Sequence, residues 1–188
     1  MSAVATRSYT VDEYLELDRE ATDERYEFQH GTVIPIAGAE PEHNQLKDNV
    51  SRELGNRLVG RECFVMMSDQ RVRVSFGYVY PDVVVACDPT YEDTRPRTLQ
   101  NPELIVEVTS DSTQARDHSD KLAAYTELDS LQEYWVLDPE KPLLTQYTPD
   151  ADGWRYRAYT DLSDTVNSDT FDLEVPLRTL YALVVSEE

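Results

Sequence analysis

Apolar residues follow two different spacings along this chain, and the spacings divide it into candidate strands and helices. Continuous apolar runs at 79–86, 104–109 and 133–137 are typical of central strands covered on both faces. Apolar positions that recur every three or four residues over 41–59 and 113–128 predict helices. Because these strands and helices alternate, the middle of the chain favours a layered fold that contains a mixed sheet.

Shorter elements flank this core. Thr10 and Glu13 have the spacing of a capping box, which predicts a short helix whose apolar side contains Val11, Tyr14, Leu15 and Leu17. Residues 25–36 indicate a hairpin with its turn at His30-Gly31. Further strands are expected at 63–67, 71–74, 143–148, 154–159 and 171–173, before a terminal helical turn at 176–183. We therefore predict an α/β or α+β fold in one domain over 1–188, with late strands added to the core.

The composition is that of a folded protein outside the membrane. The 188 residues are 40% hydrophobic, which excludes a disordered chain and allows one sizeable core. No stretch reaches the roughly 18–20 apolar residues that a membrane span needs. The first seven residues have no apolar signal core, so we expect a cytoplasmic protein. Cys63 and Cys87 lie in apolar strand-like runs, and we expect buried free thiols there rather than a disulfide.

The net charge of −20 counts against easy binding to a polyanion. Nonspecific affinity for nucleic acid comes mostly from lysine and arginine on phosphates. Three explanations stay open: adaptation of the whole surface to high salt or another host condition, a substrate that is not a long duplex, or arginines clustered near the site.

Two acids at the ends of apolar runs are the strongest chemical signal. Asp82 shares a strand face with Val84, and Glu107 shares one with Ile105. If the two strands pair, both carboxylates converge at one edge of the sheet, where the Val108 carbonyl adds an oxygen. Such a hard oxygen set suits Mg²⁺ or Mn²⁺. For Asp82 alone, a capping or turn acid is the commoner interpretation, whereas a glutamate in mid-strand is not a turn residue.

Other residues extend this candidate site. Lys121, on the next helix, is placed to orient water or stabilise charge on a phosphate, although its spacing from Asp117 also fits a surface ion pair. Glu27, before a turn, is a candidate third carboxylate. His43 and Ser110 are candidate substrate contacts, and Ser110 is equally a helix cap. A serine nucleophile is not expected, since no Gly-x-Ser-x-Gly sequence is present.

Together these residues resemble a known bacterial family. The matching motifs are Tyr26-Glu27, His43, Pro81-Asp82-Val83, 104–110, Asp117, Lys121, Tyr125 and Glu133-Tyr134-Trp135. Their order and spacing resemble the family of putative restriction endonucleases once filed as a domain of unknown function, within the PD-(D/E)xK nuclease superfamily. The resemblance covers about residues 9–184.

The resemblance implies a restriction-endonuclease-like core, a mixed sheet flanked by helices. It implies Mg²⁺ or Mn²⁺ on Asp82 and Glu107, with Glu27 as the acid from the first core element. Thr109 stands where the wider superfamily has a lysine, and the resemblance assigns that role to Lys121. His30 and Asp111 also depart from the commoner family pattern. Asp111 adds negative charge, which weakens a phosphate-binding role for its loop.

Three interpretations remain at this stage. The first is a metal-dependent endonuclease that acts on DNA, with a homodimer favoured because cutting both strands suits two-fold symmetry. The second is a catalytically inactive protein that keeps the nuclease fold as an interaction or regulatory module, as the acidic charge suggests. The third is a globular domain whose acids form ordinary ion pairs.

Overall fold

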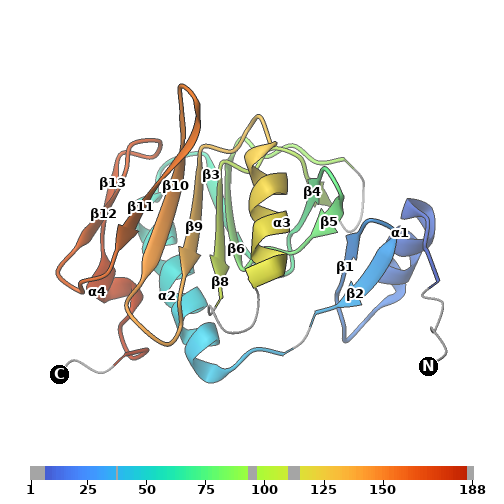
Figure 1. The fold of residues 1–188 in the computed structure, drawn as a ribbon, viewed down its shortest axis with the longest axis horizontal. Coiled ribbons are helices and arrows are strands. Elements are labelled where there is room, and N and C mark those ends of the chain that lie inside the picture. Colours follow the sequence, from blue (N-terminus) through green and yellow to red (C-terminus); the bar gives the residue numbers. More distant parts are fainter. Residues whose placement is uncertain (1–6, 37, 93–96, 110–114, 186–188) are drawn as a thin grey trace.

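The computed structural model describes residues 7–36, 38–92, 97–109 and 115–185, without the side chains of 115–119. Figure 1 shows a large sheet flanked by helices, a smaller sheet beside it that carries the N-terminal helix, and a C-terminal hairpin at the opposite edge. Mixed sheets, flanking helices and additional C-terminal strands confirm the expected fold class. In the described part of the chain, no helix is long and apolar enough to cross a membrane.

The large sheet has six strands in the order β11-β10-β9-β8-β6-β3. Only β8 and β9 run parallel among its neighbouring pairs, and α3 (Ala115–Thr126) forms the crossover between them. The strands are β3 (Cys63–Met67), β6 (Val83–Cys87), β8 (Leu104–Val108), β9 (Glu133–Leu137), β10 (Leu144–Asp150) and β11 (Gly153–Tyr159). A parallel pair needs such a crossover, which explains why helix and strand patterns alternate here.

Every residue of β8 and of β9 is buried, as the continuous apolar runs predict. Val106 and Val108 face the main core, which also contains Leu54 of helix α2 (Pro41–Arg57). Ile105 faces a second core, which contains Tyr125 of α3 and residues of the small sheet. Side chains alternate along a strand, so β8 supplies both cores and places Glu107 on the α3 face.

The two predicted helices of the core are confirmed with shorter bounds. Leu46, Val50 and Leu54 of α2 are fully buried, as their spacing predicts. The helix ends at Arg57 rather than Val59, because Val59 is 79% exposed and Gly60 takes a left-handed φ of 86°. Helix α3 ends at Thr126, and the expected start at Thr113 lies outside the described residues.

The small sheet has the order β2-β1-β5-β4-β7. Its strands are β1 (Tyr26–Gln29), β2 (Thr32–Pro35), β4 (Arg71–Val74), β5 (Gly77–Val79) and β7 (Thr98–Leu99). The predicted hairpin is thus confirmed, and its His30 adopts a φ of 49° in the turn. Hairpin and sheet together provide the surface on which the N-terminal helix packs.

Helix α1 (Val11–Glu20) begins with the predicted capping box. The Glu13 amide donates to Thr10 Oγ1 over 3.2 Å, and the Thr10 amide donates to Glu13 Oε2 over 2.9 Å. Tyr14 is fully buried, with its ring centroid 5.1 Å from that of Phe28. Val11 was expected on the apolar side, but it is 41% exposed, because the contact with the small sheet is made by the next turn.

The expected continuous strand over 79–86 is wrong. Strand β5 ends at Val79 in the small sheet, and β6 begins at Val83 in the large sheet. The segment Tyr80–Asp82 connects the two sheets. Pro81 has no amide hydrogen to donate and breaks the ladder at this point. Consequently Asp82 lies just before a strand, at the junction of both sheets.

The prediction of free thiols is also wrong. Cys63 and Cys87 form a disulfide, and both residues are half-buried. Strands β3 and β6 pair antiparallel in a register that sets the two residues directly opposite one another. Residues 24 positions apart thereby become cross-strand neighbours, which no local sequence pattern indicates.

The expected strand at 171–173 is wrong as well. The chain forms a hairpin of β12 (Thr165–Ser168) and β13 (Leu173–Pro176), and Phe171 lies in its turn region. The helical turn α4 (Leu177–Leu180) follows and is shorter than the predicted 176–183. Phe171 is buried in the main core, so its hydrophobicity reflects packing rather than strand pairing.

Candidate active site

Asp82 is held at the carboxyl end of β8 by one backbone hydrogen bond and lies close to an imidazole. Its Oδ2 accepts a hydrogen bond from the Val108 amide over 2.9 Å. His43 Nε2, from the first turns of α2, lies 3.3 Å from the same oxygen. The predicted convergence of the two acidic strand ends therefore occurs, with Asp82 attached to the residue that follows Glu107.

Glu107 is on the α3 face of β8 and is 8% exposed. Its Oε1 accepts a hydrogen bond from the Tyr125 hydroxyl over 2.7 Å. The Lys121 Nζ lies 3.3 Å from the same oxygen. Lys121 and Tyr125 are four residues apart, so one face of α3 presents both groups to the carboxylate.

Glu27 reaches the site from the small sheet and is also 8% exposed. Its Oε1 lies 3.0 Å from Lys121 Nζ and accepts the Tyr80 amide over 3.2 Å. Its Oε2 accepts a hydrogen bond from Gln29 Nε2 over 3.0 Å. Lys121 thus bridges two glutamates that come from different sheets.

The site concentrates negative charge. Burial, above all, raises the pKa of Glu107 to about 7, and the nearby Asp82 and Glu27 carboxylates raise it as well, whereas Lys121 and the Tyr125 hydroxyl oppose the rise. Burial alone would lower the pKa of Lys121, but the attraction of Glu107 and Glu27 outweighs it and raises that pKa. The ammonium is therefore charged, and among the described side chains it is the one cation paired with Glu27 and Glu107.

Of the two predicted substrate contacts, His43 lies at the site and Ser110 falls outside the described residues. His43 lies at the site, against Asp82, and its Nδ1 is buried without a hydrogen-bond partner in the described part of the chain. Ser110 and the Asp117 side chain lie outside the described residues. Val108 contributes its amide to Asp82, and the role of its carbonyl as a metal ligand stays a prediction.

Sequence reasoning missed three contributors. Tyr125 was named among the residues that carry the family resemblance, with no role assigned, yet its hydroxyl donates to Glu107. Its i, i+4 spacing from Lys121 was the available signal. The Tyr80 amide and the Gln29 side chain both bind Glu27. Gln29 shares a strand face with Glu27 on β1, and the Tyr80 amide reaches Glu27 because β5 pairs with β1 in the small sheet.

The oxygen donors fit a hard divalent cation in chemistry and in charge. Carboxylates are the protein ligands that Mg²⁺ prefers, with water and substrate phosphate completing its shell. In the described part of the site, three acids against one ammonium leave negative charge that a further cation would neutralise. Among the described residues, no group of three or more His, Cys, Asp or Glu is arranged to hold a metal by itself. A metal here would thus depend on two carboxylates together with backbone, water or phosphate oxygens.

The chain is similar to known proteins in sequence and in fold. An uncharacterized protein of Synechocystis sp. is 39% identical over 141 residues, which are 73% of this chain and 79% of that protein. A second uncharacterized Synechocystis protein is 28% identical over 173 residues, or 90% of each chain. A crystal structure described as a putative nuclease from Anabaena variabilis superposes with a TM-score of 0.76 at 15% identity. The match covers 94% of this chain and 99% of that one, and it shows a shared fold.

The family match spans the candidate site and every strand of both sheets. The model of the Uma2 family, described as "Putative restriction endonuclease", matches residues 11–179. That span includes Glu27, Asp82, Glu107 and Lys121. The chain belongs to this family of putative restriction endonucleases.

Proposed function

We propose that this chain is a metal-dependent endonuclease that hydrolyses phosphodiester bonds in DNA. The observation that carries the proposal is the buried ammonium of Lys121, which lies between Glu27 and Glu107. Asp82 is fixed against the backbone of the same strand end. Membership in the family and the nuclease-like fold support a nuclease, and the metal and the DNA substrate are our inference.

In this proposal Asp82 and Glu107 hold Mg²⁺ or Mn²⁺, with the Val108 carbonyl as a further oxygen. A bound divalent ion polarises a phosphoryl group and lowers the pKa of its water. The Lys121 ammonium stabilises the charge that grows on the phosphate. Glu27 and Glu107 fix the position of that ammonium, and Tyr125 orients the Glu107 carboxylate.

The test is a cleavage assay with supercoiled plasmid and with single-stranded DNA, in Mg²⁺, in Mn²⁺ and in EDTA. The variants are Glu107→Gln, Asp82→Asn and Lys121→Met. Glu174→Gln, at an exposed acid of β13, is the matched control. We expect metal-dependent cleavage that falls by about 100-fold or more in each site variant, the scale of losing one charge-stabilising group, and that is unchanged in the control.

A second function is favoured by one observation, the net charge of −20. A strongly acidic surface repels the DNA backbone and suits an interaction module that keeps the nuclease fold. Calorimetric titration with Mn²⁺ separates the two. Binding that Glu107→Gln abolishes supports the enzyme, whereas no cleavage and no metal binding in the unchanged protein would leave only the interaction module.

A homodimer is part of the same proposal, because two sites related by two-fold symmetry would cut both strands of a duplex. Sedimentation velocity at several concentrations tests it. A monomer at all concentrations would restrict the proposed activity to nicking or to single strands.

A further inference from the structure

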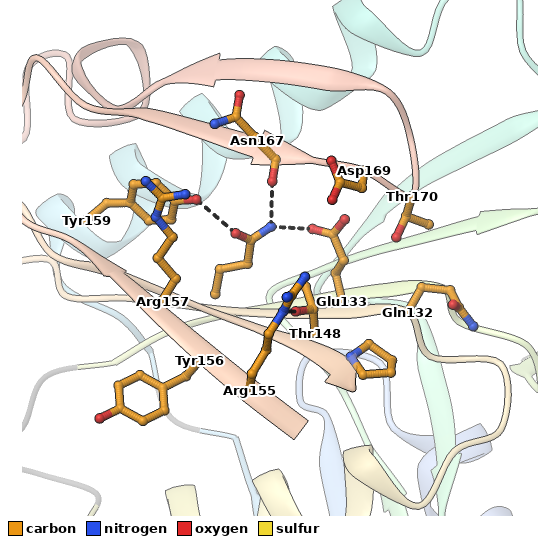
Figure 2. A pocket seen from close by; sticks show the side chains of 12 residues that line it. Gln132, Glu133, Thr148, Arg155, Tyr156, Arg157, Tyr159, Asn167, Asp169 and Thr170 are labelled. Carbon is orange, nitrogen blue, oxygen red and sulfur yellow. Dashed lines mark hydrogen bonds between the residues drawn. The ribbon is translucent and has the colours of Figure 1, made fainter. Parts of the chain in front are cut away.

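A polar pocket of about 770 Å³ lies between the β10–β11 hairpin and the C-terminal hairpin (Figure 2). Gln146 and Tyr159, which line it, share a strand face with Leu144 of the main core. Lys121 and Tyr125 lie on the other face of the sheet, with the second core. The pocket is therefore separate from the candidate active site.

The floor of this pocket is a closed hydrogen-bond network around Glu133, which is fully buried. Glu133 Oε2 accepts from Trp135 Nε1 over 2.8 Å and from Gln146 Nε2 over 2.9 Å, and Oε1 accepts from Ser168 Oγ. The Tyr159 hydroxyl donates to Gln146 Oε1 over 3.0 Å (Figure 2). Because both carboxylate oxygens of Glu133 accept hydrogen bonds, the floor of the pocket is preformed and needs no cation.

Two guanidinium groups form one wall. Arg155 and Arg157 are two residues apart on β11, so both are on the pocket side of that strand. Arg155 Nε donates to Thr148 Oγ1 over 3.1 Å. The Arg157 guanidinium carbon is 4.9 Å from the centroid of the Tyr159 ring. These contacts orient both groups without neutralising them.

The two arginines of this wall have no acid paired with them in the part of the chain that the structure describes. There are 37 acidic and 17 basic side chains, so acidic partners are plentiful. Arg52, for example, pairs with Asp48 over 2.6 Å. Within the residues that the structure describes, neither Arg155 nor Arg157 pairs with a carboxylate. Two guanidinium groups on one strand face without an ion-pair partner leave donors available to an anion.

We propose that this pocket binds a phosphate-bearing ligand of nucleotide size. Guanidinium forks match phosphate oxygens in pairs, and the volume lies in the range of small-molecule sites, roughly 300–1,000 Å³. The opposite wall carries Asn167 and the exposed Asp169 (Figure 2). An amide and a carboxylate there suit the hydroxyl and amino groups of a sugar or base better than a second phosphate.

The same phosphate chemistry has two sources, a free nucleotide or a short stretch of nucleic-acid strand. Calorimetric titrations in EDTA distinguish them, with deoxyadenosine monophosphate, unphosphorylated deoxyadenosine and a single-stranded hexanucleotide as probes. The variants are Arg155→Gln, Arg157→Gln and both together. Arg19→Gln, at an exposed arginine of α1, is the matched control. Because both target arginines are exposed, urea denaturation of each variant should match the unchanged protein.

We expect the monophosphate to bind and deoxyadenosine not to bind. Each single variant should weaken binding by about tenfold, the scale of one charge-assisted contact, and the control should not. Binding of the hexanucleotide alone, with the same dependence on both arginines, would identify a strand as the source. Absence of binding by both phosphorylated probes, equal binding of deoxyadenosine, or unchanged affinity in the double variant would overturn the proposal. None of these outcomes depends on cleavage activity.

Discussion

Replacing Lys121 by methionine removes the one ammonium that two buried glutamates share. Its Nζ lies 3.0 Å from Glu27 and 3.3 Å from Glu107, and all three side chains are less than a fifth exposed. Breaking a buried ion pair by deleting one partner costs about 3–5 kcal/mol, because the remaining charge is uncompensated. We therefore expect Lys121→Met to lower the free energy of unfolding by about this amount at pH 8, with EDTA present.

The loss should depend on pH. Burial raises the pKa of Glu107 to about 7, above its unfolded value of 4.5. The folded state thus binds this proton more tightly, and stability falls as pH rises between those values. Without Lys121 the pKa of Glu107 rises further, so at pH 5.5 the carboxyl is protonated in both proteins. The destabilisation by Lys121→Met should be smaller at pH 5.5 than at pH 8, by about 1 kcal/mol or more, since one pKa unit is about 1.4 kcal/mol.

Urea denaturation at both pH values, followed by circular dichroism, measures this difference. Lys47→Met is the matched control, because the Lys47 ammonium donates to Ser68 Oγ over 3.0 Å instead of bridging two acids. Its effect should be small and equal at both pH values. The reasoning is refuted if Lys121→Met costs no more at pH 8 than at pH 5.5, or no more than the control.

Three further predictions concern other contacts. Tyr125→Phe leaves Glu107 without its hydroxyl donor and should cost about 1–3 kcal/mol at pH 8 in urea denaturation, so an unchanged midpoint would contradict the 2.7 Å hydrogen bond. Arg71→Met removes the guanidinium that lies 2.7 Å from the buried Asp18 carboxylate. It should lower the free energy of unfolding by about 3–5 kcal/mol in the same assay. A cost near zero would show that other groups compensate Asp18. Thr10→Ala removes the cap of α1 and should lower stability by about 1 kcal/mol, visible as a lower thermal midpoint, and a higher midpoint would exclude a stabilising cap.

The sequence predicts strands and helices well where burial is strongly periodic or continuous. Strand β8 and helix α2 appear where their apolar patterns place them. The prediction fails at Tyr80–Asp82, because an apolar run continues across a change of sheet and only Pro81 marks the break. Hydrophobic patterning reports burial, and it does not report which sheet buries a residue.

The sequence likewise predicts some residues of the candidate site but not the contacts that depend on tertiary packing. Asp82 and Glu107 were expected together because both interrupt core strands, and the Val108 amide links them. Glu27 and Lys121 were each predicted as site residues, but their contact joins residues 94 positions apart and was not predicted. The role of the Tyr125 hydroxyl depends on the docking of α3 against β8, which no local pattern encodes.

Lys121 is anchored to both sheets at once, since Glu27 comes from β1 and Glu107 from β8. The cluster is therefore complete only after the N-terminal third of the chain has docked onto the rest. A proteolytically shortened chain that lacks β1 would leave the lysine with one anchor. Assembly of the two sheets thus acts as an interlock, because neither sheet alone supplies both acids that hold the ammonium.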